Sequence, residues 1–246
     1  MKRILLAAPL HQKVRYFLEF QKSLDSLLIP QGYSLDRFYV VNDCPEIIPY
    51  IREGAYIEMD GLGRQSVPHI WGTSLIEKMI KLRNAYIQYA KELNYDYVFV
   101  VDTDLVLKPE TLQVLLDTGH DIVSEGFWTK FPDDEKSIWY NGSQTIIWEF
   151  DENNTTVNAI KHHMRPGLYP IGMTGACMLV SKAVLDAGVD YSDIPYLFEQ
   201  SRSEDKNFCI RALVHGFQPY MDTHCPPVHL YDDKEYQKYM KSTYGG

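Results

Sequence analysis

Two aspartates separated by one threonine come directly after an apolar run in the middle of the chain. Asp102, Thr103 and Asp104 follow Tyr97–Val101, which the flanking acidic and turn residues mark as a central strand. Alternate residues of an extended segment point to the same side, so both carboxylates can face one site. With no thiolate or histidine nearby in the sequence, they suit a hard cation such as Mg²⁺ or Mn²⁺. Alternatively, both acids only cap the next helix, which we expect to begin near Lys108–Pro109.

A second acidic pair, Glu204 and Asp205, precedes an amphipathic segment that we predict to be a helix from Lys206 to His215. Acidic residues in a first turn interact favourably with the helix dipole, and either Ser203 or the acidic pair itself could be the N-cap, so a purely structural role is open. The residues that follow favour a functional role. They form an ordered string: Phe208-Cys209, Arg211-Ala212, Gly216-Phe217, Tyr220-Met221-Asp222-Thr223 and His229.

Composition limits the class of protein. With 246 residues, 45% of them hydrophobic and 23% charged, the chain can form one large domain with a sizeable core, and collagen-like or disordered classes are excluded. The formal net charge of −9 disfavours binding to nucleic-acid phosphates. Four scattered cysteines show no CxxC spacing, so we expect neither a zinc site nor a disulfide framework. The apolar run Ile4–Leu10 is broken by Pro9 and is too short for a membrane span, so we predict no transmembrane segment.

Strands alternate with helices in the first half of the chain. The apolar pattern predicts, in order, a strand at Ile4–Pro9, a helix at Val14–Ile29, strands at Phe38–Val41 and Ala55–Met59, a helix at Thr73–Leu93 and the strand at Tyr97–Val101. This alternation predicts an α/β fold with a mostly parallel central sheet flanked by helices. In such sheets ligands bind outside the carboxyl ends of the strands, where Asp43 and Asp102 stand.

The second half of the chain is less regular. Strands are predicted at Ile122–Ser124, Thr145–Phe150 and Cys177–Val180, and helices at Lys182–Asp186 and Lys206–His215. The stretches 60–72 and 161–172 contain glycine and proline and are predicted to be loops; loops of this length are uncommon unless they are functional. The tail, 231–244, is predicted to be a solvated terminal helix.

The ordered string after the second acidic pair resembles the inverting, family 2 type of glycosyltransferase, which has the Rossmann-like, nucleotide-binding GT-A fold. In that pattern an acidic pair opens a helix, a basic residue and a glycine follow, and a strand that ends in Asp-Thr leads to a histidine. The resemblance covers most of the chain. It implies a single domain over residues 1–246, with a nucleotide-binding half (1–107), an acceptor and catalytic half (108–230) and a C-terminal tail (231–246).

The resemblance also implies a role for individual residues. Asp205 matches the catalytic base and Glu204 its acidic neighbour, whereas Asp104 and His229 match the ligands of a divalent metal ion. The set implied for binding the nucleotide-sugar donor is Pro9, Asp43, Arg83, Asp102, Thr103, Asp104, Thr174 and Gly175. Trp128, in an expected loop, is a weaker candidate for stacking on an acceptor sugar.

The implied reaction moves a sugar from a nucleotide-sugar donor to an acceptor hydroxyl with inversion, and a UDP-sugar is favoured over a GDP-sugar. A bound Mn²⁺ or Mg²⁺ would neutralise the charge that develops on the leaving nucleoside diphosphate. A carboxylate base that takes the hydroxyl proton is typically worth about 10²–10⁴ in rate. The acceptor, whether saccharide, lipid-linked or protein, is left open. We expect a cytoplasmic protein, able to associate peripherally with the inner membrane surface, and no nucleic-acid partner.

Two other functions fit part of the pattern. Haloacid-dehalogenase-type phosphatases also place a DxD after an apolar strand, and Asp102, Asp104 and Val106 satisfy their spacing. Asp102 would then be a nucleophile that becomes phosphorylated. That family normally has the motif on the first strand of its domain, whereas three predicted strands precede it here. The third possibility is a non-catalytic nucleotide-sugar-binding module, although nothing favours loss of turnover because Asp205 and His229 are both present.

Overall fold

The first half of the chain has the predicted alternation of strands and helices. A computed structural model describes residues 1–61, 73–129, 138–140, 165–195 and 203–245. The first elements are β1 (Lys2–Leu10), α1 (Val14–Asp25), β2 (Tyr33–Val41), the 3-10 helix η1 (Pro45–Tyr50), β3 (Ala55–Glu58), α2 (Thr73–Glu92) and β4 (Tyr97–Val100). The predicted end of the first helix at Ile29 is wrong. Pro30 disfavours helical backbone just before it, and the Leu28 N–H donates to the Pro109 carbonyl instead.

The second half contains more short strands than the sequence indicates. Its elements are β5 (Leu105–Val106), α3 (Thr111–Asp117), β6 (Ile122–Glu125), β7 (Phe127–Thr129), β8 (Ile138–Tyr140), β9 (Leu168–Pro170), β10 (Met178–Ser181), α5 (Lys182–Asp186), α6 (Glu204–Val214), β11 (Tyr220–Asp222), β12 (Val228–His229) and α7 (Asp233–Tyr244). Strands of two or three residues are too short to show alternation, so most of them were not predicted. The predicted strand at Thr145–Phe150, most of the predicted loop 60–72 and the first four residues of the predicted loop 161–172 lie outside the described residues. The rest of this second loop is described, and the prediction is wrong for Leu168–Pro170, which form the strand β9.

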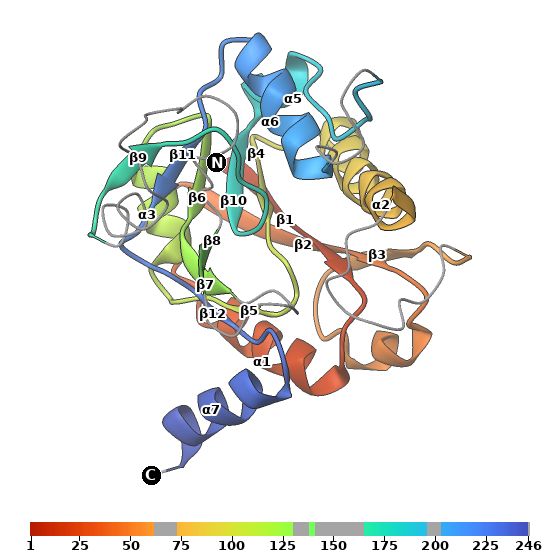
Figure 1. The fold of residues 1–246 in the computed structure, drawn as a ribbon, viewed down its shortest axis with the longest axis vertical. Coiled ribbons are helices and arrows are strands. Elements are labelled where there is room, and N and C mark those ends of the chain that lie inside the picture. The colour runs from red at the N-terminus through yellow and green to blue at the C-terminus, as the bar shows by residue number, and fades with distance from the viewer. Residues whose placement is uncertain (62–72, 130–137, 141–164, 196–202, 246) are drawn as a thin grey trace.

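One large sheet joins both halves. Within the described residues, its eight strands lie in the order β3-β2-β1-β4-β10-β6-β11-β9 (Figure 1). β3, β2, β1 and β4 are parallel to one another, as are β6 and β11, whereas β10 and β9 run antiparallel to their neighbours. The predicted α/β fold with a mostly parallel sheet is therefore confirmed.

Both faces of the sheet are covered, which explains the unbroken apolar runs of its central strands. On one face, Leu6 of β1 belongs to a core with Phe17 and Phe20 of α1. On the other face, Ala7 of β1 belongs to a core with Tyr86 of α2 and with side chains of α5 and α6. This second core holds α2 and α6 on the same face of the sheet, where their side chains can meet.

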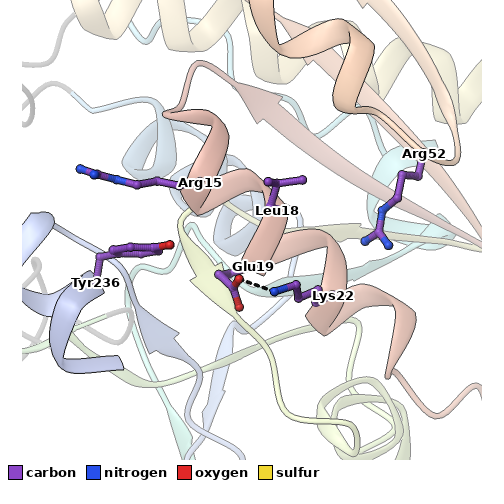
Figure 2. Close-up of a pocket in the computed structure, with 6 residues that line it drawn as sticks. All are labelled: Arg15, Leu18, Glu19, Lys22, Arg52 and Tyr236. Carbon is purple, nitrogen blue, oxygen red and sulfur yellow. Dashed lines mark hydrogen bonds and ion pairs between the residues drawn. The ribbon is translucent and has the colours of Figure 1, made fainter. Parts of the chain in front are cut away.

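The C-terminal helix α7 lies against α1 and has no buried residue. The Tyr236 ring stacks on Tyr16 with centroids 5.0 Å apart, and the Tyr16 hydroxyl donates to Asp233. Beside this contact a cavity of about 210 Å³ opens along α1 (Figure 2). Its three cationic side chains, Arg15, Lys22 and Arg52, each form an ion pair with a carboxylate of the chain. None of the helices in the described ranges is long and apolar enough to cross a membrane.

Candidate functional site

The two aspartates of the DxD segment lie in a turn at the carboxyl edge of the sheet. The Thr103 hydroxyl donates to the Pro9 carbonyl over 3.3 Å, which ties the turn to the end of β1. The side chains of Asp102 and Asp104 are 34% and 16% exposed. The alternative that both acids cap the next helix is wrong, because α3 begins only at Thr111.

Asp104 lies next to His229, although 124 residues separate them in the sequence. β5 and β12 pair antiparallel, and the Leu230 N–H donates to the Asp104 carbonyl over 2.7 Å. This pairing brings the Asp104 Oδ2 within 3.4 Å of the His229 Nε2. The rings of Phe127 and Tyr231 contact the imidazole edge-to-face, with centroids 5.3 and 5.7 Å away, which fixes its orientation.

A carboxylate oxygen and an imidazole nitrogen form a donor set that fits Mn²⁺ or Mg²⁺. Within the described residues no group of three or more potential protein ligands gathers at one point. A cation held by Asp104 and His229 would therefore depend on water and ligand oxygens for its remaining coordination, as is usual where a metal binds substrate phosphates.

The second acidic pair opens α6 and is buried. Ser203 is the N-cap, because its side chain accepts from the Lys206 N–H, so the predicted structural role of Ser203 is confirmed. The helix begins at Glu204, two residues earlier than predicted, because the cap draws the acidic pair into its first turn. Glu204 and Asp205 are both buried. Burying a charge is unfavourable unless it is paired, so acids that only interact with a helix dipole are expected to stay in contact with solvent. The burial of this pair therefore favours a further role.

Arg83 of α2 pairs with the acids of both motifs. Its Nε donates to Glu204 Oε1 over 3.3 Å and lies 3.6 Å from Asp205 Oδ1, whereas its Nη2 lies 3.5 Å from Asp102 Oδ1. We call Arg83, Asp102, Glu204 and Asp205 the carboxylate cluster. The structure thus joins the two acidic motifs through a residue on a third element.

Burial dominates the electrostatics of the cluster. It raises the pKa of the Asp205 carboxyl well above its ordinary value, and the Arg83 charge is the main opposing influence. The pKa of Glu204 is raised for the same reason, and Arg83 again opposes the shift. Arg83 therefore favours the ionised form of both acids, against the effect of burial.

The segment that carries Thr174 and Gly175 lies against α6. The Thr174 N–H donates to the Cys209 Sγ, and the Cys209 thiol donates to the Thr174 carbonyl, each over 3.4 Å. The Thr174 hydroxyl donates to Ser124 Oγ over 2.6 Å. Gly175 directly faces Asp205, so close that a Cβ would lie 2.6 Å from the Asp205 Oδ1.

Asp43 and Trp128 lie on other elements than the residues of the carboxylate cluster. Asp43 follows β2, has a positive φ of 47° and accepts from the Gly61 N–H over 2.8 Å. β1 separates β2 from β4 and the DxD turn. Trp128 lies on β7 rather than in a loop and is 42% exposed, next in sequence to Phe127, which contacts His229. Asp43 thus stands at the carboxyl edge of the large sheet, as the DxD turn does, whereas Trp128 stands on the separate β7–β8 pair.

A buried acid pair was not recognised in the sequence. Glu125 and Asp222 end the parallel strands β6 and β11 and stand opposite each other. The Cys225 N–H donates to Glu125 Oε2 over 3.2 Å, and the His224 N–H donates to Asp222 Oδ1 over 2.8 Å. Burial, followed by the nearby Asp222 charge, raises the pKa of Glu125 to about 9. The signal that could have found Glu125 is the one that found Asp102, an acid directly after an apolar strand.

Comparison with known proteins identifies a family from the sequence. Residues 55–187, more than half of the chain, match a family model described as glycosyltransferase family 25, N-terminal domain. The matched range includes the DxD turn and Gly175 but neither α6 nor His229. No curated protein matches the sequence.

Solved structures share the fold at low sequence identity. Residues 1–349 of S. aureus TarS align over 98% of this chain and 64% of that chain, with a TM-score of 0.50 and 15% identity. The mannosyltransferase PcManGT from Pyrobaculum calidifontis, in complex with GDP-Man and Mn²⁺, aligns over 96% of this chain and 59% of that chain, with a TM-score of 0.56 and 12% identity. The chain therefore spans less than two thirds of either protein. It has the GT-A fold expected from the sequence and belongs to the glycosyltransferase family that the matching model describes.

Proposed function

We propose that this chain transfers a sugar from a nucleotide-sugar donor to an acceptor hydroxyl, with inversion and with a bound Mn²⁺ or Mg²⁺. The observation that carries the proposal is the approach of Asp104 to His229, at 3.4 Å, in the same turn whose Asp102 joins the carboxylate cluster. The proposed cation site and the proposed base are thus joined through one short turn and Arg83. Glycosyl transfer needs both, because one group must leave as a diphosphate while another loses a proton.

The donor would lie along the carboxyl ends of β1, β2 and β4. Asp43, at the end of β2, would contact the base or ribose, and Asp102 the ribose, with Pro9 and Thr103 forming the floor between them. Thr174 and Gly175 would lie under the sugar, next to Asp205. UDP is favoured and GDP comes next. Two structural neighbours were solved with such ligands, TarS with UDP and PcManGT with GDP-Man and Mn²⁺.

Asp104 and His229 would hold the divalent cation. When bound there, the cation supplies positive charge that stabilises the leaving diphosphate. The pairing of β5 with β12 and the two rings beside the imidazole hold His229 in place for this task.

Asp205 would act as the base, with Glu204 as its acidic neighbour. The acceptor oxygen forms a bond to the anomeric carbon, the bond from that carbon to the phosphate oxygen breaks, and the acceptor proton passes to Asp205. Attack from the face opposite the leaving diphosphate inverts the anomeric centre. Trp128, the exposed aromatic residue of β7, is the proposed stacking surface for an acceptor sugar.

The proposed roles divide between the halves of the chain. Residues 1–107 supply most donor contacts, residues 108–230 supply Asp205, Trp128 and His229, and 231–246 form a tail. The residues proposed to hold the cation come from both halves, since Asp104 belongs to the first and His229 to the second. The acceptor class, saccharide, lipid-linked or protein, and the cytoplasmic location stay predictions.

The first test is a thermal-shift panel of UDP, GDP, CDP and dTDP, each with and without Mn²⁺. A ligand at about 100 times its dissociation constant should stabilise the protein by about 2.7 kcal/mol. We expect a Mn²⁺-dependent shift with UDP or, next, GDP, followed by release of that nucleoside diphosphate from the corresponding nucleotide sugar. Release of inorganic phosphate would instead support the phosphatase alternative. A shift without any release would support a binding module, and no shift with any nucleotide would contradict the proposal.

A further inference from the structure

Arg83 lies at the centre of the candidate site but is shut off from solvent. Its side chain is only 2% exposed. A buried guanidinium is tolerated when carboxylates pair with it, and three of them do so here. The paired carboxylates come from the turn after β4 and from the start of α6, so Arg83 joins three elements that are remote in sequence.

Every nitrogen of the guanidinium is engaged by the protein itself. Nε faces Glu204 and Asp205, and Nη2 faces Asp102. The remaining Nη1 donates to the Tyr86 hydroxyl over 3.2 Å. The Tyr191 ring covers the group at 5.5 Å from its central carbon, a favourable cation–π arrangement. A nucleotide phosphate could reach Arg83 only by displacing one of these partners.

The charge balance around Asp205 makes Arg83 important for its ionisation. The charged or titratable groups that act on Asp205 in the described residues are Arg83 on α2, Glu204 and Cys209 on α6, Asp102 after β4, and Tyr191. Arg83 is the cation of this set. Burial raises the pKa of Asp205 and Arg83 lowers it, so loss of the guanidinium would favour the protonated acid, which cannot accept a proton.

We propose that Arg83 is a positioning residue, which acts on the reaction through Asp205 and holds that carboxylate as an oriented anion, fixed to the DxD turn through Asp102. This inference rests on the proposed function, because it takes Asp205 as the base. It assigns Arg83 a different task from the direct donor contact that the family resemblance implies.

The test is the pH dependence of kcat at saturating donor for the wild type, Arg83→Lys and Arg83→Gln. In Arg83→Gln we expect the acid limb of the profile to move to higher pH by about one unit or more. Raising the pH should then restore much of the lost kcat. Arg83→Lys keeps the charge and should move the limb less. The KM for the donor should change less than about threefold, since a positioning residue contributes little to donor affinity. An unmoved acid limb together with a large rise in KM would overturn the proposal in favour of a direct nucleotide contact.

Arg37 offers a matched control. Its side chain is also largely buried, and it pairs with Asp25 and Glu53 at 2.9 and 3.3 Å. Arg37→Gln should lower the Tm, as loss of any buried arginine does, but should leave the acid limb in place. A shift of the limb in this variant as well would show that general destabilisation, and not the Arg83–Asp205 contact, moves the profile.

A second readout does not need activity. Arg83→Gln leaves three carboxylates without their cation, so its Tm should fall, and the additional change Asp205→Asn should raise it again by removing one of these charges. If the Tm losses of Arg83→Gln and Asp205→Asn simply add in the double variant, the two side chains are not coupled and the proposal is contradicted. If Arg83→Gln does not fold, the pH profile of Arg83→Lys and the Tm of the double variant test the proposal instead. A wild type that neither binds nor cleaves any nucleotide sugar defeats the proposed function, whereas an active wild type with an unmoved limb in the variants defeats only this inference.

Discussion

Gly175 and Asp205 approach so closely that any side chain at residue 175 would force the Asp205 carboxylate to move. A Cβ at Gly175 would lie 2.6 Å from the Asp205 Oδ1 and would overlap the rest of the carboxylate. The neighbouring Thr174 is held to α6 by two hydrogen bonds with Cys209, so the glycine segment cannot easily move away. The position of the proposed base therefore depends on the absence of a side chain at residue 175.

Gly175→Ala should displace the Asp205 carboxylate and lower transfer by about 10²–10⁴, the usual contribution of a general base. Nucleoside diphosphate binding with Mn²⁺ should remain. The measurement is kcat together with the thermal shift given by the nucleotide. Gly119→Ala is the control, because Gly119 has a positive φ of 67° but open space around it, so alanine there strains only the backbone. Equal losses of kcat in the two variants would contradict the specific role of Gly175.

Asp205→Asn should keep donor binding and lose transfer by about 10²–10⁴, because the amide preserves the shape of the side chain but cannot accept the acceptor proton. The comparison is kcat and donor KM against the wild type. Asp186→Asn serves as the control, since Asp186 pairs with Lys182 on the helix surface at α5. Full activity of Asp205→Asn would move the base to another residue.

Asp104→Ala and His229→Ala should each abolish the Mn²⁺-dependent part of nucleotide binding, because each removes one of two protein donors from a site that lacks a third in the described residues. The check is the thermal shift of the bound nucleotide with and without Mn²⁺. His224→Ala is a suitable control, as the His224 ring contacts Asp222 at 3.0 Å instead. A Mn²⁺-dependent shift of wild-type size in either Asp104→Ala or His229→Ala would refute the cation site.

The parts of the site that the sequence could predict are those that depend on local pattern. The apolar strand before Asp102 predicted that this residue stands at the carboxyl edge of the sheet, and the helical period predicted α2 itself, but not the burial of Arg83 on it. The pairing of Asp104 with His229 was expected only from the family resemblance. What Arg83 would touch could not be predicted, because its partners Glu204 and Asp205 follow 121 and 122 residues later in the chain. Such contacts depend on how α2 and α6 pack on one face of the sheet, which no local pattern specifies.

The same limit applies to Glu125 and Gly175. Glu125 is an acid at the end of an apolar strand, but only the pairing of β6 with β11 shows that it is buried beside Asp222. Gly175 stands in a segment that the sequence describes as glycine-containing. The sequence does not show that a Cβ at residue 175 would collide with Asp205, because this depends on how the Gly175 backbone packs against the first turn of α6.

Glu125→Gln should reduce the dependence of stability on pH. Burial and the Asp222 charge raise the pKa of Glu125 from 4.5 to about 9, so at neutral pH the acid is protonated in the folded protein and ionised in the unfolded chain. The folded state then binds the additional proton, and the free energy of unfolding falls as pH rises from 4.5 towards 9, by up to about 1.4 kcal/mol per pH unit. Below 4.5 this contribution is fully present.

Glutamine keeps the shape and hydrogen-bonding capacity of the protonated acid and cannot ionise. The variant should therefore lose less stability than the wild type between about pH 5 and pH 9, and its advantage should grow with pH. Urea unfolding across this range measures the two slopes. Glu204 and Asp205, whose pKa values are raised in the same direction, leave a residual slope in the variant. Glu58→Gln, on the exposed strand β3, should follow the wild type. Parallel curves for Glu125→Gln and the wild type would show that Glu125 does not hold its proton in the folded state.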